Sequence, residues 1–339
     1  MKKWVLSGEQ KIVLENNPPS TLTPEKDVKV RIEEVLLGKF DLALFHGQAK
    51  TKYPMILGKY AVGVVSDVFN PETSPFQKMN RVVVEPFISC HQCANCKNDD
   101  EPNCLKMQEL GYNADGLLVD FCDLPQTCLH KLPDSLNNTK ALFVPYVAFC
   151  LNVIDSLKIE KGSHVAVYSS SKIGIIASEL LKYYQCVPIF VSDNEDALKR
   201  AKELGIFYAF NPNTTDVEQE IVMATGGKLC DEVIYFANSR TSLKEVLNIC
   251  AFHATICIGG YNTSSGSLNL SQITKKHLNI TGIYNGCGNY PSAINLIATN
   301  KVSVNELIDR DVHFSTLDEE LKLIQPEDIG YKSVRILVD

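Results

Sequence analysis

Residues 164–193 read HVAVYSSSKIGIIASELLKYYQCVPIFVSD, and this stretch decides the fold class. Two apolar runs that suit strands flank a segment of about ten residues or more with the apolar spacing of a helix. The same alternation continues in EDALKRAKELG (195–205), DEVIYFA (231–237), SLKEVLNIC (242–250) and ATICIGG (254–260). Strands alternating with helices indicate an α/β fold with a doubly wound parallel sheet.

The first part of the chain follows a different pattern. Up to residue 143, short β-type runs are separated by Pro, Asn, Asp and Gly, which favours an antiparallel or barrel-like domain. From about residue 286 the pattern is mixed again, and it ends in the strand-like VRILVD (334–339). A chain of 339 residues is long for one core, so we expect two domains.

Composition limits the possible partners. The 33 Lys and Arg against 40 Asp and Glu give a net charge of −7 without a basic stripe, which disfavours nucleic acid and acidic membranes. The start, MKKWVLSGEQ, has too few apolar residues for a signal peptide, and no run approaches the ~18 apolar residues of a membrane span. We therefore expect a cytoplasmic protein with reduced cysteines and a small-molecule substrate.

Four cysteines form a candidate metal site. Residues 90–104 read CHQCANCKNDDEPNC, which places Cys90, Cys93, Cys96 and Cys104 in the spacing C-x2-C-x2-C-x7-C. Four thiolates satisfy the tetrahedral coordination of zinc and leave no position open for water or substrate. The pattern predicts one structural zinc ion per chain. The alternative is four free surface thiols, but thiols at this density would oxidise or bind metal.

A lysine interrupts an apolar run in residues 54–65, PMILGKYAVGVV. The run ends in β-branched residues and suits an interior strand, yet Lys59 and Tyr60 stand in its middle. A buried ammonium group costs several kcal/mol unless it is paired or loses its charge. Lys59 therefore either has an anionic partner or faces a wet pocket where its charge acts on a ligand.

The order of these features resembles the zinc alcohol and polyol dehydrogenases of the medium-chain dehydrogenase/reductase family. The likeness covers nearly the whole chain. Its pieces are Asp41 and His46-Gly47 in KFDLALFHG (39–47), Gly58, the cysteine lobe, Gly174, Asp193, AKELG (201–205) and SVRILV (333–338). The resemblance implies a GroES-like β-rich substrate domain (1–143 and 286–339) and a Rossmann dinucleotide-binding domain (144–285). It also implies a homodimer or homotetramer, with NITGIY (279–284) as a candidate pairing edge.

The family's reactive site is a second zinc that holds the substrate oxygen. Alignment on Asp41 and Gly58 places Gly38 and Lys59 at two of its ligand positions, and counting back from the nucleotide loop places Val144 at the third. Protonated lysine has no lone pair for a metal, and the other two side chains offer no donor atom. We therefore expect the catalytic zinc to be absent.

The resemblance also suggests what Lys59 does. The family's aspartate at position 41 lies beside the metal ligand that Lys59 replaces, so we expect an ion pair between Lys59 and Asp41. In the functional interpretation, Lys59 or Tyr60 donates a proton to a carbonyl oxygen as hydride arrives. In the structural interpretation, the pair only fills the site that the metal left. The hydroxyl of the family's proton relay is missing, since Phe40 stands at its position.

The nucleotide loop departs from the family pattern. The expected G-x-G-x-x-G falls on residues 169–174, where Ser169 and Ser171 replace two glycines and only Gly174 remains, after Ile173. Serine hydroxyls can still donate to phosphate at a helix N-terminus. Asp193 lies 19 residues beyond Gly174, where a carboxylate can accept hydrogen bonds from ribose hydroxyls and disfavour NADP relative to NAD.

One of these positions has an alternative interpretation, and one more glycine of the family pattern is missing. Asp193 could instead be a solvated residue that opens the turn into the next helix. A further family glycine, near the nicotinamide, is replaced by Asn238.

Two functions remain possible from the sequence. The first is an NAD(H)-dependent oxidoreductase of small alcohols or carbonyls that works without a catalytic zinc, with Lys59, Tyr60 and Asp41 in the active site. The second is a pseudoenzyme that keeps the fold and the structural zinc and acts as a binding or regulatory protein. Loss of metal ligands alone suits a reductase, whereas loss of loop glycines as well favours the pseudoenzyme. The substrate is not defined by the sequence.

Overall fold

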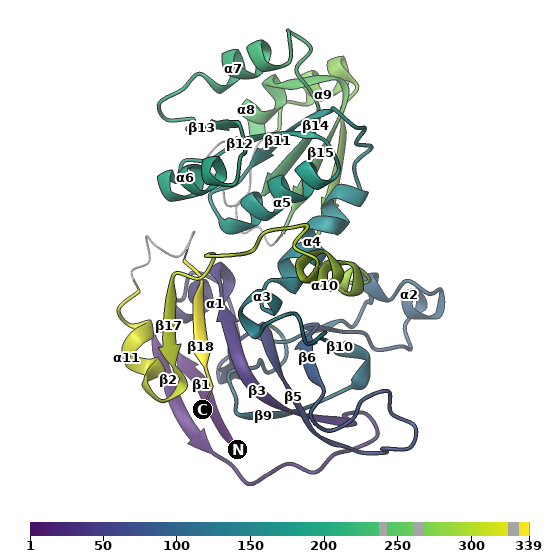
Figure 1. Cartoon of the computed structure of the whole chain (residues 1–339), viewed down its shortest axis with the longest axis vertical. Helices are drawn as coiled ribbons and strands as arrows, with labels where there is room; N and C mark the ends of the chain where they lie inside the picture. Colours follow the sequence, from purple (N-terminus) through teal and green to yellow (C-terminus); the bar gives the residue numbers. More distant parts are fainter. Residues whose placement is uncertain (237–242, 261–267, 325–331, 339) are drawn as a thin grey trace. The chain divides into compact units, whose positions relative to one another are not determined.

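The computed structural model describes residues 1–236, 243–260, 268–324 and 332–338, so Asn238 lies outside the described residues. The chain forms two compact units (Figure 1). The first comprises Met1–Pro145, Tyr290–Ala298 and Val304–Asp339, and the second comprises Tyr146–Asn289 and Thr299–Ser303. In the part of the chain that the structure describes, every helix is too short or too polar to cross a membrane.

The second unit contains the predicted parallel sheet. Its strand order is β13-β12-β11-β14-β15-β16, which is the doubly wound order 3-2-1-4-5-6 and confirms the α/β fold class. The strands are β11 (His164–Tyr168), β12 (Val187–Val191), β13 (Tyr208–Phe210), β14 (Cys230–Phe236), β15 (Cys250–Gly259) and β16 (Asn279–Ile283). The helices are α5 (Lys172–Tyr183), α6 (Glu195–Glu203), α7 (Val217–Ala224), α8 (Leu243–Asn248) and α9 (Leu270–Lys276), and α4 (Val144–Asp155) spans the boundary between the units.

Local sequence explains these elements. From Val165 to Tyr168, β11 is buried at every position, as expected for a parallel strand covered on both faces. Helix α6 begins where the Asn194 side chain accepts a hydrogen bond from the N–H of Ala197 at 2.8 Å. Acidic residues occupy its first turn and basic residues its last, which complements the helix dipole.

The first unit is β-rich. Its main sheet has the order β10-β6-β5-β3-β18-β17, and β9 also pairs with β3. The strands are β1 (Lys2–Gly8), β2 (Lys11–Asn16), β3 (Val28–Leu37), β4 (Met55–Ile56), β5 (Tyr60–Val68), β6 (Arg81–Val84), β7 (Phe87–Ile88), β8 (Gln108–Glu109), β9 (Phe121–Leu124), β10 (Leu129–Lys131), β17 (Arg310–His313) and β18 (Val334–Leu337). The helices are α1 (Lys39–Phe45), α2 (Ala94–Lys97), α3 (Asn138–Ala141), α10 (Tyr290–Ala298) and α11 (Leu317–Leu321), with 3-10 turns at Glu101–Asn103, Gln126–Cys128 and Phe314–Thr316.

The C-terminal segment completes this sheet, because the last strand, β18, pairs with β3 (Figure 1). Alternation along the strands sends Val35 and Ala61 into the hydrophobic core. Their neighbours point to the opposite face, where Tyr60, Leu36 and Arg335 are direct cross-strand partners in one row. This face therefore carries Tyr60 and the polar residues of β18.

Candidate active site and metal centre

Lys59 immediately precedes β5, and its side chain is only 12% exposed. The ammonium group donates a hydrogen bond to Oε1 of Glu109, whose side chain is 5% exposed. The expected ion pair between Lys59 and Asp41 is therefore wrong, because the carboxylate that pairs with the ammonium comes from β8 instead. The two buried charges compensate each other, whereas either charge alone would be costly to bury here.

Aromatic rings surround the ammonium group. The Nζ of Lys59 lies 4.7 Å from the ring centroid of Phe87, 5.7 Å from that of Tyr60 and 5.8 Å from that of Phe40. The negative face of an aromatic ring attracts a cation, and the attraction grows as water is removed. We define Lys59, Glu109 and these three rings as the ammonium cage.

Asp41 supports the cage through the backbone. The carboxylate is fully buried and accepts hydrogen bonds from the N–H of Gly38 at 3.1 Å and from the N–H of Gly58 at 3.0 Å. The first bond caps helix α1, and the second holds the residue before Lys59. Burial raises the pKa of Asp41 to about 6, although the two backbone donors and the charge of Lys59 act in the opposite direction.

Gly58 must be glycine for this arrangement. Its φ of +94° lies in a region that other residues rarely adopt, and an added Cβ would lie 3.0 Å from the backbone nitrogen of Leu118. The turn at Gly58 therefore aims the next residue, Lys59, into the cage.

Sequence reasoning missed Glu109 and Phe87. They lie on β8 and β7, which pair with each other just outside the two ends of the cysteine lobe. Glu109 is a single carboxylate in a polar stretch, and no spacing in the sequence relates it to Lys59, which is 50 residues away. Their position next to the lobe's first and last cysteines was the one available signal.

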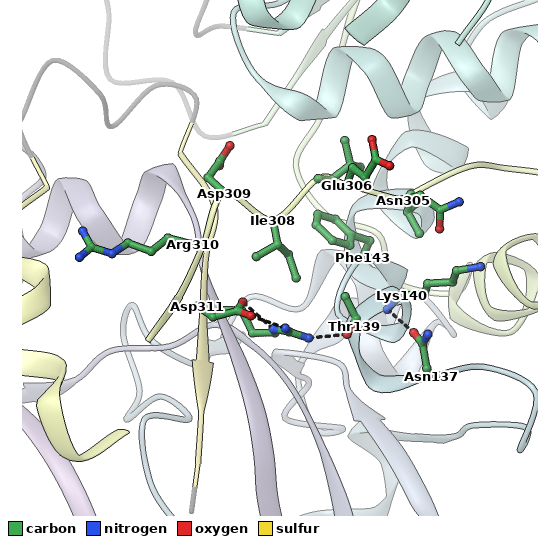
Figure 2. A pocket seen from close by; sticks show the side chains of 13 residues that line it. Asn137, Thr139, Lys140, Phe143, Asn305, Glu306, Ile308, Asp309, Arg310 and Asp311 are labelled. Atoms are coloured by element: carbon green, nitrogen blue, oxygen red, sulfur yellow. Dashed lines mark hydrogen bonds and ion pairs between the residues drawn. The ribbon is translucent and has the colours of Figure 1, made fainter. Parts of the chain in front are cut away.

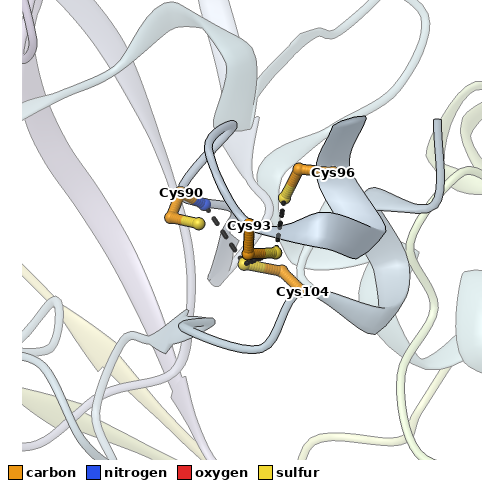
Figure 3. Close-up of side chains that lie close together, drawn as sticks. All are labelled: Cys90, Cys93, Cys96 and Cys104. Atoms are coloured by element: carbon orange, nitrogen blue, oxygen red, sulfur yellow. Dashed lines mark hydrogen bonds between the residues drawn. The ribbon is translucent and has the colours of Figure 1, made fainter. Parts of the chain in front are cut away.

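The four cysteines of the lobe come together as predicted (Figure 3). Their sulfur atoms all lie within 4.8 Å of one another, with 3.4 Å between Cys93 and Cys96 and 3.9 Å between Cys93 and Cys104. Zn–S bonds of about 2.3 Å in a tetrahedron place sulfurs roughly 3.8 Å apart, so the donor set fits zinc. When bound, the metal would cross-link the lobe, and its chemistry there would be structural.

Backbone groups prepare two of these sulfurs, those of Cys90 and Cys93, to bind a cation, whereas burial raises the pKa of Cys96 to about 12. Hydrogen bonds from the backbone N–H groups of Cys96 and Leu105 lower the pKa of Cys93 to about 6. A hydrogen bond from the backbone of Gln92 is the main cause that lowers the pKa of Cys90. Thiolates are the form that binds zinc, so these N–H groups favour metal binding.

The family's positions for a catalytic zinc hold no comparable donors. Gly38 caps α1, Lys59 is an ammonium paired with Glu109, and Val144 is a buried residue at the start of α4. Within the described ranges, the cysteine lobe is the only group of three or more Cys, His, Asp or Glu side chains close enough to share a metal. The residue types therefore support metal binding at the lobe.

The purified protein is expected to contain about one zinc ion per chain, because four thiolates complete one tetrahedral site. Elemental analysis by mass spectrometry against the protein concentration measures this ratio. Substitution of Cys104 by serine should bring zinc well below one per chain. Two zinc ions per chain would contradict our interpretation of Gly38, Lys59 and Val144.

The serine-rich loop lies between β11 and α5. The N–H of Ser171 donates to the hydroxyl of Ser169 at 3.2 Å, and that hydroxyl also lies 3.2 Å from the carbonyl of Ser171. Gly174 is required here, because an added Cβ would lie 2.4 Å from the Cβ of Ser169 and 2.8 Å from the ring of Phe190. The glycine that lets α5 pack closely against the sheet is therefore retained. Part of the loop's hydrogen-bonding capacity is used within the loop itself. The carbonyl of Ile173, the residue before Gly174, accepts a hydrogen bond from the thiol of Cys150.

Asp193 follows β12 and lines a pocket of about 340 Å³ in the second unit, together with Tyr168, Asn213 and Asp216. Its carboxylate accepts a hydrogen bond from the hydroxyl of Ser170 in the serine-rich loop. A crevice at the carboxyl ends of β11 and β12 is where a doubly wound fold binds a dinucleotide. These residues fit the ribose end of such a ligand.

A second pocket, of about 390 Å³, lies in the first unit (Figure 2). Phe143 and Ile308 contribute apolar surface, and Asn137, Lys140 and Asp309 contribute polar groups. Arg335 lines it and binds both oxygens of Asp311, at 2.9 and 2.6 Å. Arg335 and Tyr60 share one row of the sheet, with one strand between them, so the two side chains lie on the same face, although no residue of the ammonium cage lines this pocket.

Comparison with known families identifies both units. Residues 24–134 match the model described as the alcohol dehydrogenase GroES-like domain, and residues 173–299 match the model described as zinc-binding dehydrogenase. The chain belongs to the medium-chain dehydrogenase/reductase family, in the group of zinc-type alcohol and polyol dehydrogenases. The resemblance read from the sequence is thereby confirmed.

Relatives span nearly the whole chain. A zinc-type alcohol dehydrogenase-like protein from Haemophilus influenzae is 27% identical over 87% of this chain and 87% of its own length. D-xylulose reductase A from Aspergillus oryzae is 25% identical over 93% of this chain and 91% of its own.

Solved structures share the fold. A zinc-binding dehydrogenase from Sinorhizobium meliloti 1021, bound to NADP, has a TM-score of 0.89 at 21% identity and covers 99% of this chain and 98% of that one. An alcohol dehydrogenase from Escherichia coli CFT073, bound to NADH, has a TM-score of 0.89 at 22% identity and covers 99% of both chains.

Proposed function

We propose that this protein is a nicotinamide-dependent oxidoreductase of small alcohols or carbonyl compounds that works without a catalytic zinc. The observation that carries the proposal is the ammonium cage, a buried and paired lysine in a chain of this dehydrogenase family. The resemblance implies that Lys59 stands at the position of a metal ligand. Lys59 thus supplies positive charge where the family's metal would act on the substrate oxygen.

The residues of the cage suit carbonyl reduction. A bound dinucleotide would supply the hydride. Negative charge then grows on the carbonyl oxygen, and Lys59 stabilises it by donating a hydrogen bond from its ammonium group. The oxygen takes a proton from Lys59 or from the phenol of Tyr60, and water returns a proton to the donor. Oxidation of the alcohol follows the same steps in reverse.

The pocket beside Arg335 offers a place for the rest of the substrate. It combines apolar surface with amide, ammonium and carboxylate groups, and it lies on the face that carries Tyr60. The charges that line it are mixed, with Lys140 and Arg335 beside Glu306, Asp309 and Asp311, while Arg310 pairs with Glu320, which does not line the pocket. A small neutral substrate with hydroxyl groups fits this mixture of charges better than an anion does.

Asp193 favours NAD over NADP. A carboxylate at this position accepts from ribose hydroxyls and repels a 2′-phosphate. Asp216, Glu218 and Glu245 line the same pocket and add negative charge. Solved structures of the same fold hold NADP in one case and NADH in another, so the choice depends on residues such as these rather than on the fold.

NADH is expected to bind saturably, as measured by nicotinamide fluorescence, and NADPH more weakly. Substitution of Asp193 by alanine should weaken NADH binding about 10-fold, the loss of one charge-assisted hydrogen-bonding group. Asp196→Ala is the matched control, because this carboxylate lies in the first turn of α6 and outside the pocket. Absence of saturation at millimolar NADH would contradict the proposal.

That outcome would favour the second candidate, a pseudoenzyme with a binding or regulatory role. The specific observation in its support is the serine-rich loop, where the N–H of Ser171 already donates to Ser169. A pyrophosphate would have to compete with that bond.

A further inference from the structure

We propose that the metal lobe controls the position of Lys59: the two strands that close the neck of the lobe are the ones that hold the ammonium group. The structural part of this inference stands on contacts within the first unit. Its consequence for turnover rests on the proposed function. Glu109 and Phe87 are then positioning residues, which act on the reaction through Lys59.

The neck of the lobe consists of the two short strands β7 and β8, and both of them contact Lys59. β7 leads from Phe87 toward the first ligand, Cys90, and β8 returns from the last ligand, Cys104, to Glu109. The two strands pair with Phe87 opposite Glu109 and Ile88 opposite Gln108. One strand places its ring 4.7 Å from the ammonium, and the other provides the carboxylate that binds it.

Hydrogen bonds continue from the metal ligands to Glu109. The N–H groups of Cys90 and Lys106 both point to the sulfur of Cys104, at 3.3 and 3.4 Å. The side chain of Asn113 then joins the next residues, accepting from the N–H of Glu109 at 2.7 Å and donating to the carbonyl of Met107 at 3.0 Å. The segment after Cys104 is thus tied at one end to the sulfur cluster and at the other to Lys59.

A ladder of two residue pairs is marginal by itself, since isolated two-stranded ribbons are barely stable in water. The lobe between the strands is mostly polar loop with short helical turns and contributes few buried apolar side chains. A metal that joins Cys90 to Cys104 closes this loop and removes the entropy cost of bringing the strands together. Without the metal, Glu109 and Phe87 lose one of the constraints that present them to Lys59, and the hydrogen bond from the N–H of Leu110 to the carbonyl of Pro86, at 2.9 Å, is left to hold the two strands together.

The reactivity of Lys59 toward an amine-acylating reagent measures its position directly. The protein as purified, with its zinc measured, is compared with protein stripped by a chelator and with stripped protein to which zinc is returned. Mass spectrometry of peptides gives the acylation rate of each lysine. Removal of zinc is expected to raise the rate at Lys59 about 10-fold through local opening, and added zinc should restore the slow rate.

Lys29 is the internal control. Its side chain is 16% exposed, close to the value for Lys59, and it forms an ion pair with Asp123 at 3.6 Å and donates a hydrogen bond to the carbonyl of Ser20, but it lies on β3 and makes none of the lobe's contacts. Its rate should change less than about two-fold on zinc removal, since local opening of the lobe does not reach it. An equal rise at Lys29 and Lys59 would indicate general loosening and overturn the inference, as would an unchanged rate at Lys59.

Variants separate positioning from folding. In zinc-loaded protein, Glu109→Gln should raise the acylation rate of Lys59 and leave that of Lys29 unchanged. Asp123→Asn should raise the acylation rate of Lys29 and leave that of Lys59 unchanged. Glu109→Asp, which keeps the charge, should restore part of the protection. Cys104→Ser should mimic zinc removal even when NADH still binds. Because acylation requires no turnover, a failed NADH titration would refute the proposed function and leave this test intact.

Discussion

Substitution of Lys59 by methionine is expected to reduce turnover by about 10³-fold while leaving the Kd for NADH within about two-fold of its original value. The side chain of Lys59 is 12% exposed, and its ammonium group pairs with the carboxylate of Glu109. Methionine keeps much of the volume and removes the charge. A developing alkoxide in this site would then lose its donor, whereas Asp193 and the loop after β11 would be unchanged.

A buried carboxylate would remain without its partner in this variant, so loss of stability must be distinguished from loss of catalysis. The double variant Lys59→Met with Glu109→Gln removes both charges and should be as inactive as the single variant but more stable, since an uncompensated buried charge is strongly destabilising. Lys29→Met, which breaks the matched pair with Asp123, should retain turnover. Initial rates at saturating NADH, with thermal unfolding measured in parallel, test this. Unchanged turnover in Lys59→Met would mean that the ammonium cage has a structural role only and takes no part in the reaction.

The sequence predicts the parts of this protein that depend on local pattern. Apolar periodicity identified most strands and helices of the second unit, although not β13, α7 or α9, because the face on which a side chain lies follows from its spacing along one segment. The cysteine spacing identified the metal lobe for a similar reason, since its ligands lie within one short loop. Lys59 was recognised as unusual because a charge in an apolar strand conflicts with burial.

The partner of Lys59 could not be found in this way. Asp41 was expected on the basis of the family's metal site, but its carboxylate is used by the N–H groups of Gly38 and Gly58. Glu109 reaches the ammonium because β7 and β8 pair at the neck of the lobe, and a two-residue pairing leaves no periodic signal in the sequence. The contact between Ser170 and Asp193 was missed for the same reason: it joins two loops at the ends of neighbouring strands.

Asp41 provides a pH test of the backbone support beneath the cage. Burial raises its pKa from 3.8 to about 6 in the folded protein. Between these values the folded state holds the proton and the unfolded state does not, so stability falls as pH rises from about 4 to about 6 and then levels off. At 1.36 kcal/mol per pKa unit, the full titration removes about 3 kcal/mol, of which about 1 kcal/mol falls between pH 5 and pH 7.5.

The variant Asp41→Asn isolates this effect, because asparagine does not titrate. Its amide oxygen is the one acceptor left for the two N–H donors, so the substitution lowers the stability by an amount that does not depend on pH. The stability of the natural protein minus that of the variant, from urea unfolding, should therefore decrease by about 1 kcal/mol from pH 5 to pH 7.5. Asp67→Asn is the control: this carboxylate is 52% exposed and Lys78 lowers its pKa, so its difference should not decrease. If the stability difference between the natural protein and Asp41→Asn did not change with pH, the carboxylate of Asp41 would be as well solvated as an exposed one. The turn at Gly58 would then be held by other groups.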